Sequence, residues 1–349
     1  VYKRQTGDFR VLAGIAVNNV TGYADRVTVD AIKTFHPGDL RNARISYEIT
    51  EPTLRHTFGL AYSETNYDVE DLPFKVEGNT EIGEAYVKSS WYRRQTANIY
   101  SRLALSTKRA DQDVLNNSLG VDRLTVLTAS LIGDHVDTRF KGLQRASVTW
   151  HQGIDDFLGS MDKAGNANSL GVVYNQQRLS GEFEKVSATY SRLQTLSTNN
   201  SLLFRYAMQH SDDNLSSLER MAMSGPYTVR AYEIGEFTAD SGNFLSAEWR
   251  INGGLFSDGN VFGENSWSDV LELTVFYDWA NGRLKNGDGS KTKERIQGAG
   301  IGLSLTVPDY GAYAKIEVAK PTSTSSIVNR VNQRDNKQEQ LWVVLGFTF

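Results

Sequence analysis

Apolar and polar residues alternate with a period of two along the whole chain. In the C-terminal stretch LWVVLGFTF, every second residue from Leu341 to Phe349 is apolar, and the residues between them fall on the other face. Such a period is typical of a β-strand, and about sixteen segments follow it. They read FRVLAGIAV, VTVDAIKTF, RISYEI, HTFGLAYSE, EAYVKSSWY, IYSRLALS, LTVLTASLIG, LQRASVTW, KVSATYSRL, LLFRYAMQ, LERMAMS, FLSAEWRI, LELTVFYDWA, IQGAGIGLSLTV, AYAKIEVA and LWVVLGFTF. Because the pattern keeps its character throughout, we predict one all-β antiparallel domain over residues 1–349.

Two architectures use so many amphipathic strands. In a soluble sandwich or propeller the apolar faces meet in a core, whereas in an outer-membrane barrel they face lipid and the polar faces line a wet lumen. Charged residues in mid-strand, such as Arg205, Glu272 and Lys315, favour the transmembrane barrel, as do aromatic residues near strand ends. Phe349 ends the last alternating strand, which resembles the C-terminal insertion signal of bacterial outer-membrane barrels.

A membrane barrel must close, because lipid offers no partner for an open sheet edge. We therefore expect the first strand, near residues 9–17, to pair with the last, near residues 341–349. An even number of strands places both termini on the periplasmic side. Counted in this way, the segment 225–242 follows the eleventh strand and starts outside the cell, and residues 157–171 form a periplasmic connection.

Composition narrows the classes of function. A formal net charge of -4 provides no basic surface for nucleic acid, which we exclude as a partner. With 0 cysteines the chain has no thiolate metal site and no cysteine nucleophile. The 5 histidines are scattered singly, without the spacing of a metal site, and GDHVD around His135 has no second acidic pair to complete an acid–base site. We expect no metal, no cofactor and no enzymatic activity, and no apolar run predicts a transmembrane helix.

The stretch SGPYTVRAYEIGEFTADSGNFLSAEWRI carries a resemblance to a known family. It resembles the sixth-loop signature of the two-partner secretion transporters (the TpsB family), whose tetrad is V-R-G-Y or V-R-G-F. Here the tetrad is Val229, Arg230, Ala231 and Tyr232, and the change from Gly to Ala removes some backbone freedom.

Further stretches extend this resemblance over nearly the whole chain. FYDWANGR, residues 276–283, resembles the family's thirteenth-strand motif, in which an aspartate, here Asp278, follows an aromatic pair. SWYRRQTANIYSRLALSTK resembles the hairpin of the fifth and sixth strands, and SRLQTLSTNNSLLFRYAMQHSDDNL that of the ninth and tenth.

The resemblance implies that the segment 225–242 folds back into the lumen. A guanidinium confined there needs an anion, and Asp278 lies on the lumenal face of its strand. We expect a bidentate pair of Arg230 with Asp278 that fastens the segment to the wall, with Glu248 and Glu272 as second candidates on the same face. Gly298, Gly300 and Gly302 point inward from the next strand and would let another backbone approach closely.

The resemblance also implies a function in the bacterial outer membrane. Such a transporter moves one large unfolded exoprotein of the TpsA type to the cell surface through a pore gated by the in-folded segment. We expect contacts with outer-membrane lipid and lipopolysaccharide, and with the barrel assembly machinery during biogenesis. The family's periplasmic POTRA domains, which capture the exoprotein by strand addition, are expected to be absent from residues 1–349. An assembly factor that inserts barrel proteins and a general porin remain alternatives.

Overall fold

The computed structural model describes residues 9–35, 39–51, 55–69, 76–114, 117–163, 170, 179–253, 256, 259–286, 290–322 and 339–347. Nearly all regular structure in these residues is β. The strands are β1 (Phe9–Asn18), β2 (Asp25–Phe35), β3 (Asp39–Glu51), β4 (His56–Val69), β5 (Val76–Arg93), β6 (Ala97–Val114), β7 (Asn117–Asp137), β8 (Gly142–Ile154), β9 (Phe183–Ser197), β10 (Asn200–His210), β11 (Met221–Ala222), β12 (Thr238–Ala239), β13 (Ser241–Asn252), β14 (Asn260–Phe262), β15 (Asn265–Ser266), β16 (Leu271–Lys285), β17 (Lys291–Val307), β18 (Ala312–Pro321) and β19 (Gln340–Phe347). One helical turn, α2 (Trp267–Val270), precedes β16, and a 3-10 turn, η1 (Pro308–Tyr310), precedes β18.

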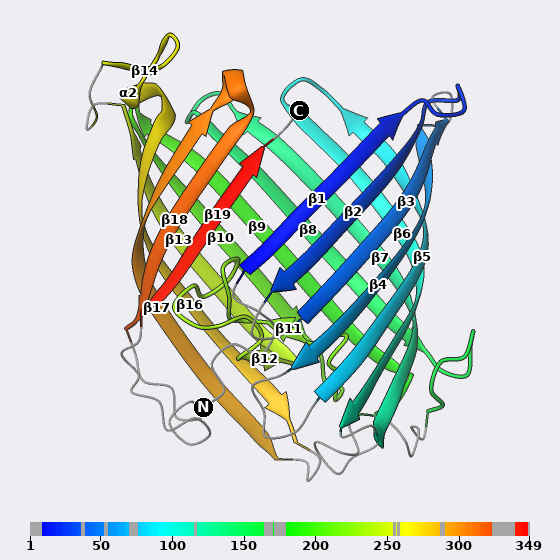
Figure 1. Ribbon diagram of the computed structural model, residues 1–349. Coiled ribbons are helices and arrows are strands. Elements are labelled where there is room, and N and C mark those ends of the chain that lie inside the picture. The colour runs from blue at the N-terminus through cyan, green and yellow to red at the C-terminus, as the bar shows by residue number, and fades with distance from the viewer. Residues whose placement is uncertain are drawn as a thin grey trace.

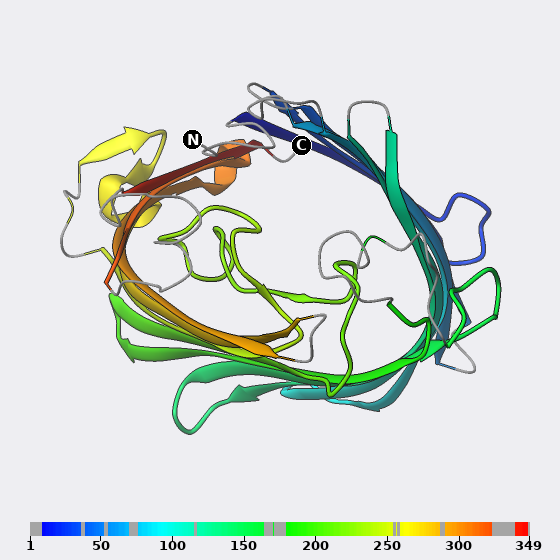
Figure 2. The ribbon, with the colours of Figure 1, turned by 90° about the horizontal axis from the view of Figure 1, so that it is seen from below.

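Fifteen strands form one antiparallel sheet in chain order, from β1 to β10 and then β13, β16, β17, β18 and β19. We call this sheet the wall. It curves around a bore that contains part of the chain (Figures 1 and 2). Large apolar side chains such as Leu60, Leu131 and Val148 are exposed on its outer face, where lipid would cover them. Their neighbours along each strand point into the bore, so the period of two in the sequence is the inside–outside alternation of the wall.

No helix among the described residues is long and apolar enough to cross a bilayer.

The predicted all-β antiparallel architecture is confirmed, and every predicted strand but one lies in the wall. The exception is LERMAMS, residues 218–224, whose assignment to the wall was wrong. In that segment only Met221 and Ala222 form a strand, which pairs with β12 in a small ribbon inside the bore, and Ser224 makes an isolated bridge with Val229. The segment alternates because Met221 and Met223, two residues apart, both pack against one apolar cluster inside the bore. A chain with one face on apolar protein and the other on polar groups therefore shows the same period as a wall strand.

The predicted pairing of the first and last strands is absent from the described residues, in which β1 and β19 are the two edges of the sheet. The strand direction reverses from each wall strand to the next. With an odd number of wall strands, the two edge strands β1 and β19 therefore run in the same direction, as Figure 1 shows. The start of β1 and the end of β19 consequently lie at opposite ends of the bore. This corrects the expectation for the described parts of the first and last predicted strands, 9–17 and 341–347, whereas the termini themselves lie outside the described residues.

The connections of the wall differ between its two ends. Residues 19–24, 94–96, 138–141 and 198–199 make short turns at one end, where only 253–270 is longer, whereas 155–182 and 211–240 are long connections at the other. Long connections lie outside the cell in outer-membrane barrels, so we assign the second end to the exterior. The described part of 157–171, residues 157–163 and 170, therefore belongs to a connection at the same end as the start of 211–240. The periplasmic placement of 157–171 was wrong because the count took the first strand to start at the periplasmic end, whereas β1 starts at the end assigned to the exterior.

A charge placed on the outer face should destabilise this barrel far more than the same charge placed inside. Val148 lies mid-strand in β8 and is exposed on the outer face, and its neighbour Ser147 faces the bore. We expect Val148→Arg to lower the free energy of unfolding in lipid vesicles by about 2–4 kcal/mol, the cost of Arg at the bilayer midplane. Ser147→Arg, the matched control at the same depth, should change it by well under half as much. Equal losses in urea titrations of the two variants would contradict the assignment of faces.

Candidate functional site

The connection between β10 and β13, residues 211–240, runs inside the bore (Figure 2). We call it the inner segment. It contains most of the predicted in-folded stretch 225–242, whose last two residues already belong to β13. The ribbon of β11 and β12 joins its two arms, and a tight turn at residues 225–232 forms its tip. The part of the chain that resembles the family's loop signature therefore lies within the barrel.

The tip depends on one glycine for its geometry. Gly225 has a φ of +123°, which side-chain-bearing residues rarely adopt. Its carbonyl accepts a hydrogen bond from the Thr228 N–H at 3.1 Å, and its own N–H donates to the Val229 carbonyl at 3.3 Å. Ala231 does not have a positive φ, so the tetrad tolerates alanine where the family has glycine.

An apolar cluster holds the inner segment against the wall. Its members on the segment are Met223, Val229, Ala231, Tyr232, Phe237 and Ala239, and those on the wall are Phe244, Phe276, Ala280, Ile296 and Ala319. Val229 is fully buried, and the rings of Tyr232 and Phe237 meet edge to face with centroids 5.6 Å apart. The inner face of β13, β16, β17 and β18 is thus locally apolar where the segment covers it.

Arg230 lies at the centre of the polar contacts, with only 1% of its surface exposed. Its Nε and Nη2 donate to the two carboxylate oxygens of Asp278, each at 2.8 Å, and its backbone N–H donates to the same carboxylate at 3.2 Å. Its Nη1 donates to Glu317 Oε1 at 2.8 Å and lies 3.2 Å from Glu248 Oε1. The expected bidentate pair with Asp278 is present, and carboxylates from three strands surround one guanidinium. We call this group the Arg230 site.

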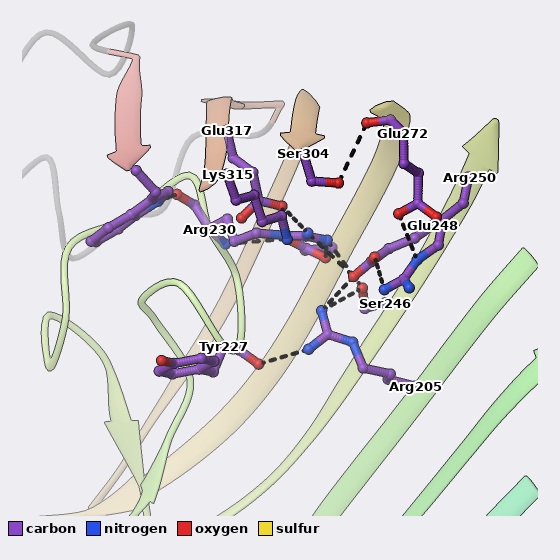
Figure 3. A network of polar contacts seen from close by, with 12 residues as sticks. Arg205, Tyr227, Arg230, Ser246, Glu248, Arg250, Glu272, Ser304, Lys315 and Glu317 are labelled. Atoms are coloured by element: carbon purple, nitrogen blue, oxygen red, sulfur yellow. Dashed lines mark hydrogen bonds and ion pairs between the residues drawn. The ribbon is translucent and has the colours of Figure 1, made fainter. Parts of the chain in front are cut away.

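The surrounding charges are paired in turn (Figure 3). Glu248 also accepts hydrogen bonds from Arg205 at 2.9 Å and Arg250 at 3.1 Å. Lys315 Nζ lies 2.9 Å from Glu317, so each carboxylate that contacts Arg230, except Asp278, has a further cation beside it. Removal of Arg230 would leave Asp278, which is fully buried, without its ion-pair partner.

The three inward glycines of β17 have different roles. Gly298 lies under the tip, since an added Cβ would come within 2.4 Å of the Ala231 Cβ. Gly300 makes room for the Phe276 ring, which an added Cβ would meet at 2.3 Å. The Arg230 guanidinium carbon lies 3.4 Å from the centre of that ring, so glycine, ring and guanidinium are stacked in layers. Gly302 lies beside Glu317 and not beside the inner segment, which corrects the expectation of close backbone approach there.

Sequence reasoning also missed or misplaced some residues. Glu317 is a direct partner of Arg230 that the sequence pattern did not identify. Glu272 was wrong as a candidate partner, because it lies 3.9 Å from Arg250 and level with Ser304 on β17, further along the wall. Trp342 of β19 donates its indole N–H to the Arg230 carbonyl at 2.8 Å. Phe349 lies outside the described residues, so its role in insertion stays a prediction.

The described residues contain no group of three or more metal-ligating side chains.

The model of the haemolysin secretion/activation protein family ShlB/FhaC/HecB matches residues 3–305. The chain belongs to this family. The match confirms the resemblance to two-partner secretion transporters and the localisation as an integral barrel of the bacterial outer membrane. The family consists of secretion channels and is not known as a family of enzymes.

Individual relatives agree with this family. The heme/hemopexin transporter protein HuxB of Haemophilus influenzae is 25% identical over 362 residues, which cover 99% of this chain and 58% of HuxB. This chain therefore spans little more than half the length of that relative. Among solved structures, CdiB from Escherichia coli has a TM-score of 0.76 at 16% identity, covering 98% of this chain and 60% of CdiB. BamA from Haemophilus ducreyi lacking POTRA domains 1–3 has a TM-score of 0.64 at 12% identity, covering 99% and 69%. These likenesses show a shared fold.

A side chain at Gly298 should displace the tip of the inner segment. We expect Gly298→Val to raise the labelling rate of a single cysteine introduced at Val229 by about tenfold or more, because the added atoms overlap Ala231 and favour the open arrangement. The chain has 0 cysteines, so the introduced thiol is the only one in this sequence. Gly346→Val is the matched control, since an added Cβ there meets nothing within 4 Å. Labelling that stays at the parental rate in Gly298→Val would refute the close approach.

Proposed function

We propose that the protein forms the outer-membrane pore through which a large exoprotein crosses, as an unfolded chain, from the periplasm to the cell surface. In this proposal the inner segment closes the pore at rest and the Arg230 site fastens its tip. The observation that carries the proposal is a guanidinium buried inside the bore and shared by carboxylates of β13, β16 and β18. Membership of the haemolysin secretion/activation family supports the direction of transport.

The proposed mechanism involves binding and movement and no bond chemistry. An extended chain needs the space that the inner segment occupies, so the tip must leave the wall before the exoprotein passes. Breaking a buried ion pair costs about 3–5 kcal/mol when the remaining charge stays buried, but less when water enters and hydrates it. Folding of the exoprotein outside the cell would then prevent its return and give transport its direction.

We also propose the partners. The cargo is a TpsA-type exoprotein, and because HuxB is named for heme and hemopexin, an exoprotein that handles one of these is the first candidate. Residues 1–349 act as one barrel domain. Outer-membrane lipid and lipopolysaccharide cover the exposed apolar face, and the barrel assembly machinery inserts the chain.

One observation favours the alternative of an assembly factor that inserts barrel proteins. β1 and β19 do not pair with each other in the described residues, and a sheet edge there would be available to a strand of another protein. The fold is also shared with BamA. A general porin is less well supported, since a non-selective pore has no need of an arginine buried in three carboxylates.

Export should depend on the Arg230 site while insertion does not. In cells that produce the protein together with a TpsA-type exoprotein, we expect Arg230→Ala and Asp278→Ala each to reduce secreted exoprotein by about tenfold or more. The first leaves Asp278 buried without its cation, and the second removes the bidentate partner that positions Arg230, so the tip loses its defined position. Amounts of inserted, heat-modifiable barrel should stay unchanged. Tyr227→Ala is the control, since its side chain is 77% exposed on the same segment.

Two results would count against the proposal. Export at the parental level in both variants would remove the Arg230 site from the mechanism. Unchanged export together with a general loss of other outer-membrane barrels would support the assembly-factor alternative instead.

A further inference from the structure

A second buried ion-pair site lies around Glu219. We call residues 215–219 of the inner segment its base. The side chain of Glu219 is 1% exposed, and its two carboxylate oxygens contact different lysines. Lys108 Nζ of β6 lies 2.5 Å from one oxygen, and Lys185 Nζ of β9 lies 2.8 Å from the other. One carboxylate of the inner segment thus connects two wall strands that are not neighbours in the sheet.

The backbone at Glu219 is held at the same place. Its carbonyl accepts hydrogen bonds from Lys185 Nζ at 2.8 Å and from the Gln209 side-chain amide at 3.0 Å. The same Gln209 amide donates to the Asp240 carbonyl at 3.1 Å, so the two arms of the inner segment are joined there. Glu219 is therefore fixed through both its side chain and its main chain.

Glu219 is ionised in this environment. Burial acts to raise the pKa of its carboxyl group, but Lys108 and Lys185 together hold the pKa below its ordinary value. The charges of the site have the opposite arrangement to those around Arg230, with the anion on the segment and the cations on the wall. Loss of the carboxylate would leave two ammonium groups close together with no anion between them.

Neighbouring contacts attach the rest of the base to the same part of the wall. Ser216 Oγ donates to Asp122 of β7 at 2.6 Å. Leu215 is 1% exposed and packs with Leu124 and Val126 of β7. The base is thus fixed to β6, β7 and β9, whereas the Arg230 site fixes the tip to β13, β16 and β18. The ion-pair partners of Glu219 and Arg230 thus lie on different strands, although β10 contacts both parts, through Gln209 at the base and Arg205 at the tip.

We propose that Glu219 is a second positioning residue of the gate, which holds the base of the inner segment to β6 and β9 independently of the hold of Arg230 on the tip. This proposal deepens the proposed function and rests on it, because it assigns the inner segment to gating. Opening of the pore then has two separable steps, release of the tip and release of the base. If the exoprotein chain displaced only the tip, the base would still block part of the bore.

Two cysteine reporters can separate the steps in the outer membrane of intact cells. A cysteine at Leu215 reports on the base and a cysteine at Val229 on the tip, and both positions are buried. We expect Glu219→Gln to raise the labelling rate at position 215 by about tenfold or more, because labelling follows the population of the open base, and to change the rate at 229 by less than about twofold. Arg230→Ala should show the reverse.

Lys108→Gln provides a second variant, with the same expected result, should Glu219→Gln fail to insert. Asp212→Asn is the matched control, since this carboxylate is on the same segment and its side chain is 86% exposed. Unchanged labelling at 215 in the Glu219 and Lys108 variants would overturn the proposal, as would equal rises at 215 and 229, which would show that the segment moves as one unit. Labelling does not depend on export, so a failure of the export proposal would be seen separately.

Discussion

The burial of a guanidinium inside a membrane barrel determines how the rest of this structure is built. A charged group removed from water needs compensating charge and hydrogen bonds on nearly every donor, and Arg230 obtains them from Asp278, Glu317 and Glu248 on three different strands. A single strand cannot provide this arrangement, because successive inward side chains of one strand lie about 6–7 Å apart along it. The site therefore requires a curved sheet, an intervening strand without side chains at Gly298 and Gly300, and a chain segment that returns into the bore.

Much of the wall and of the Arg230 site could be predicted from the sequence, because each residue of a barrel wall faces either lipid or the bore. Lipid and water on opposite faces impose a period of two, which identified fifteen wall strands and placed Asp278 and Glu248 on the inner face. The same rule could not exclude residues 218–224. Met221 and Met223 face one apolar cluster inside the bore, and alternation does not tell lipid from protein as the apolar neighbour.

The choice between Glu272 and Glu317 shows a second limit. Both lie on the inner face, but only the register between strands determines their height along the bore. Glu317 pairs with Gly302 of β17, whereas Glu272 pairs with Ser304, one inward position further from Gly298 and the tip. One signal for the site was present in the sequence, since Phe244, Phe276 and Ile296 are large apolar residues on an otherwise polar face. In a wet bore such residues indicate that protein covers that part of the wall.

The ion pairs and apolar contacts of the inner segment suit a segment that must move inside a membrane barrel. The outer face of the wall cannot rearrange without exposing backbone to lipid, so the strands provide a fixed frame. Inside the bore, by contrast, each charge released from the inner segment meets water, which repays much of the lost ion-pair energy. The apolar clusters, around Val229 and Phe276 at the tip and around Leu215 and Leu124 at the base, resist hydration. The ion pairs therefore define where the segment rests, whereas the size of the apolar clusters sets most of the cost of its leaving.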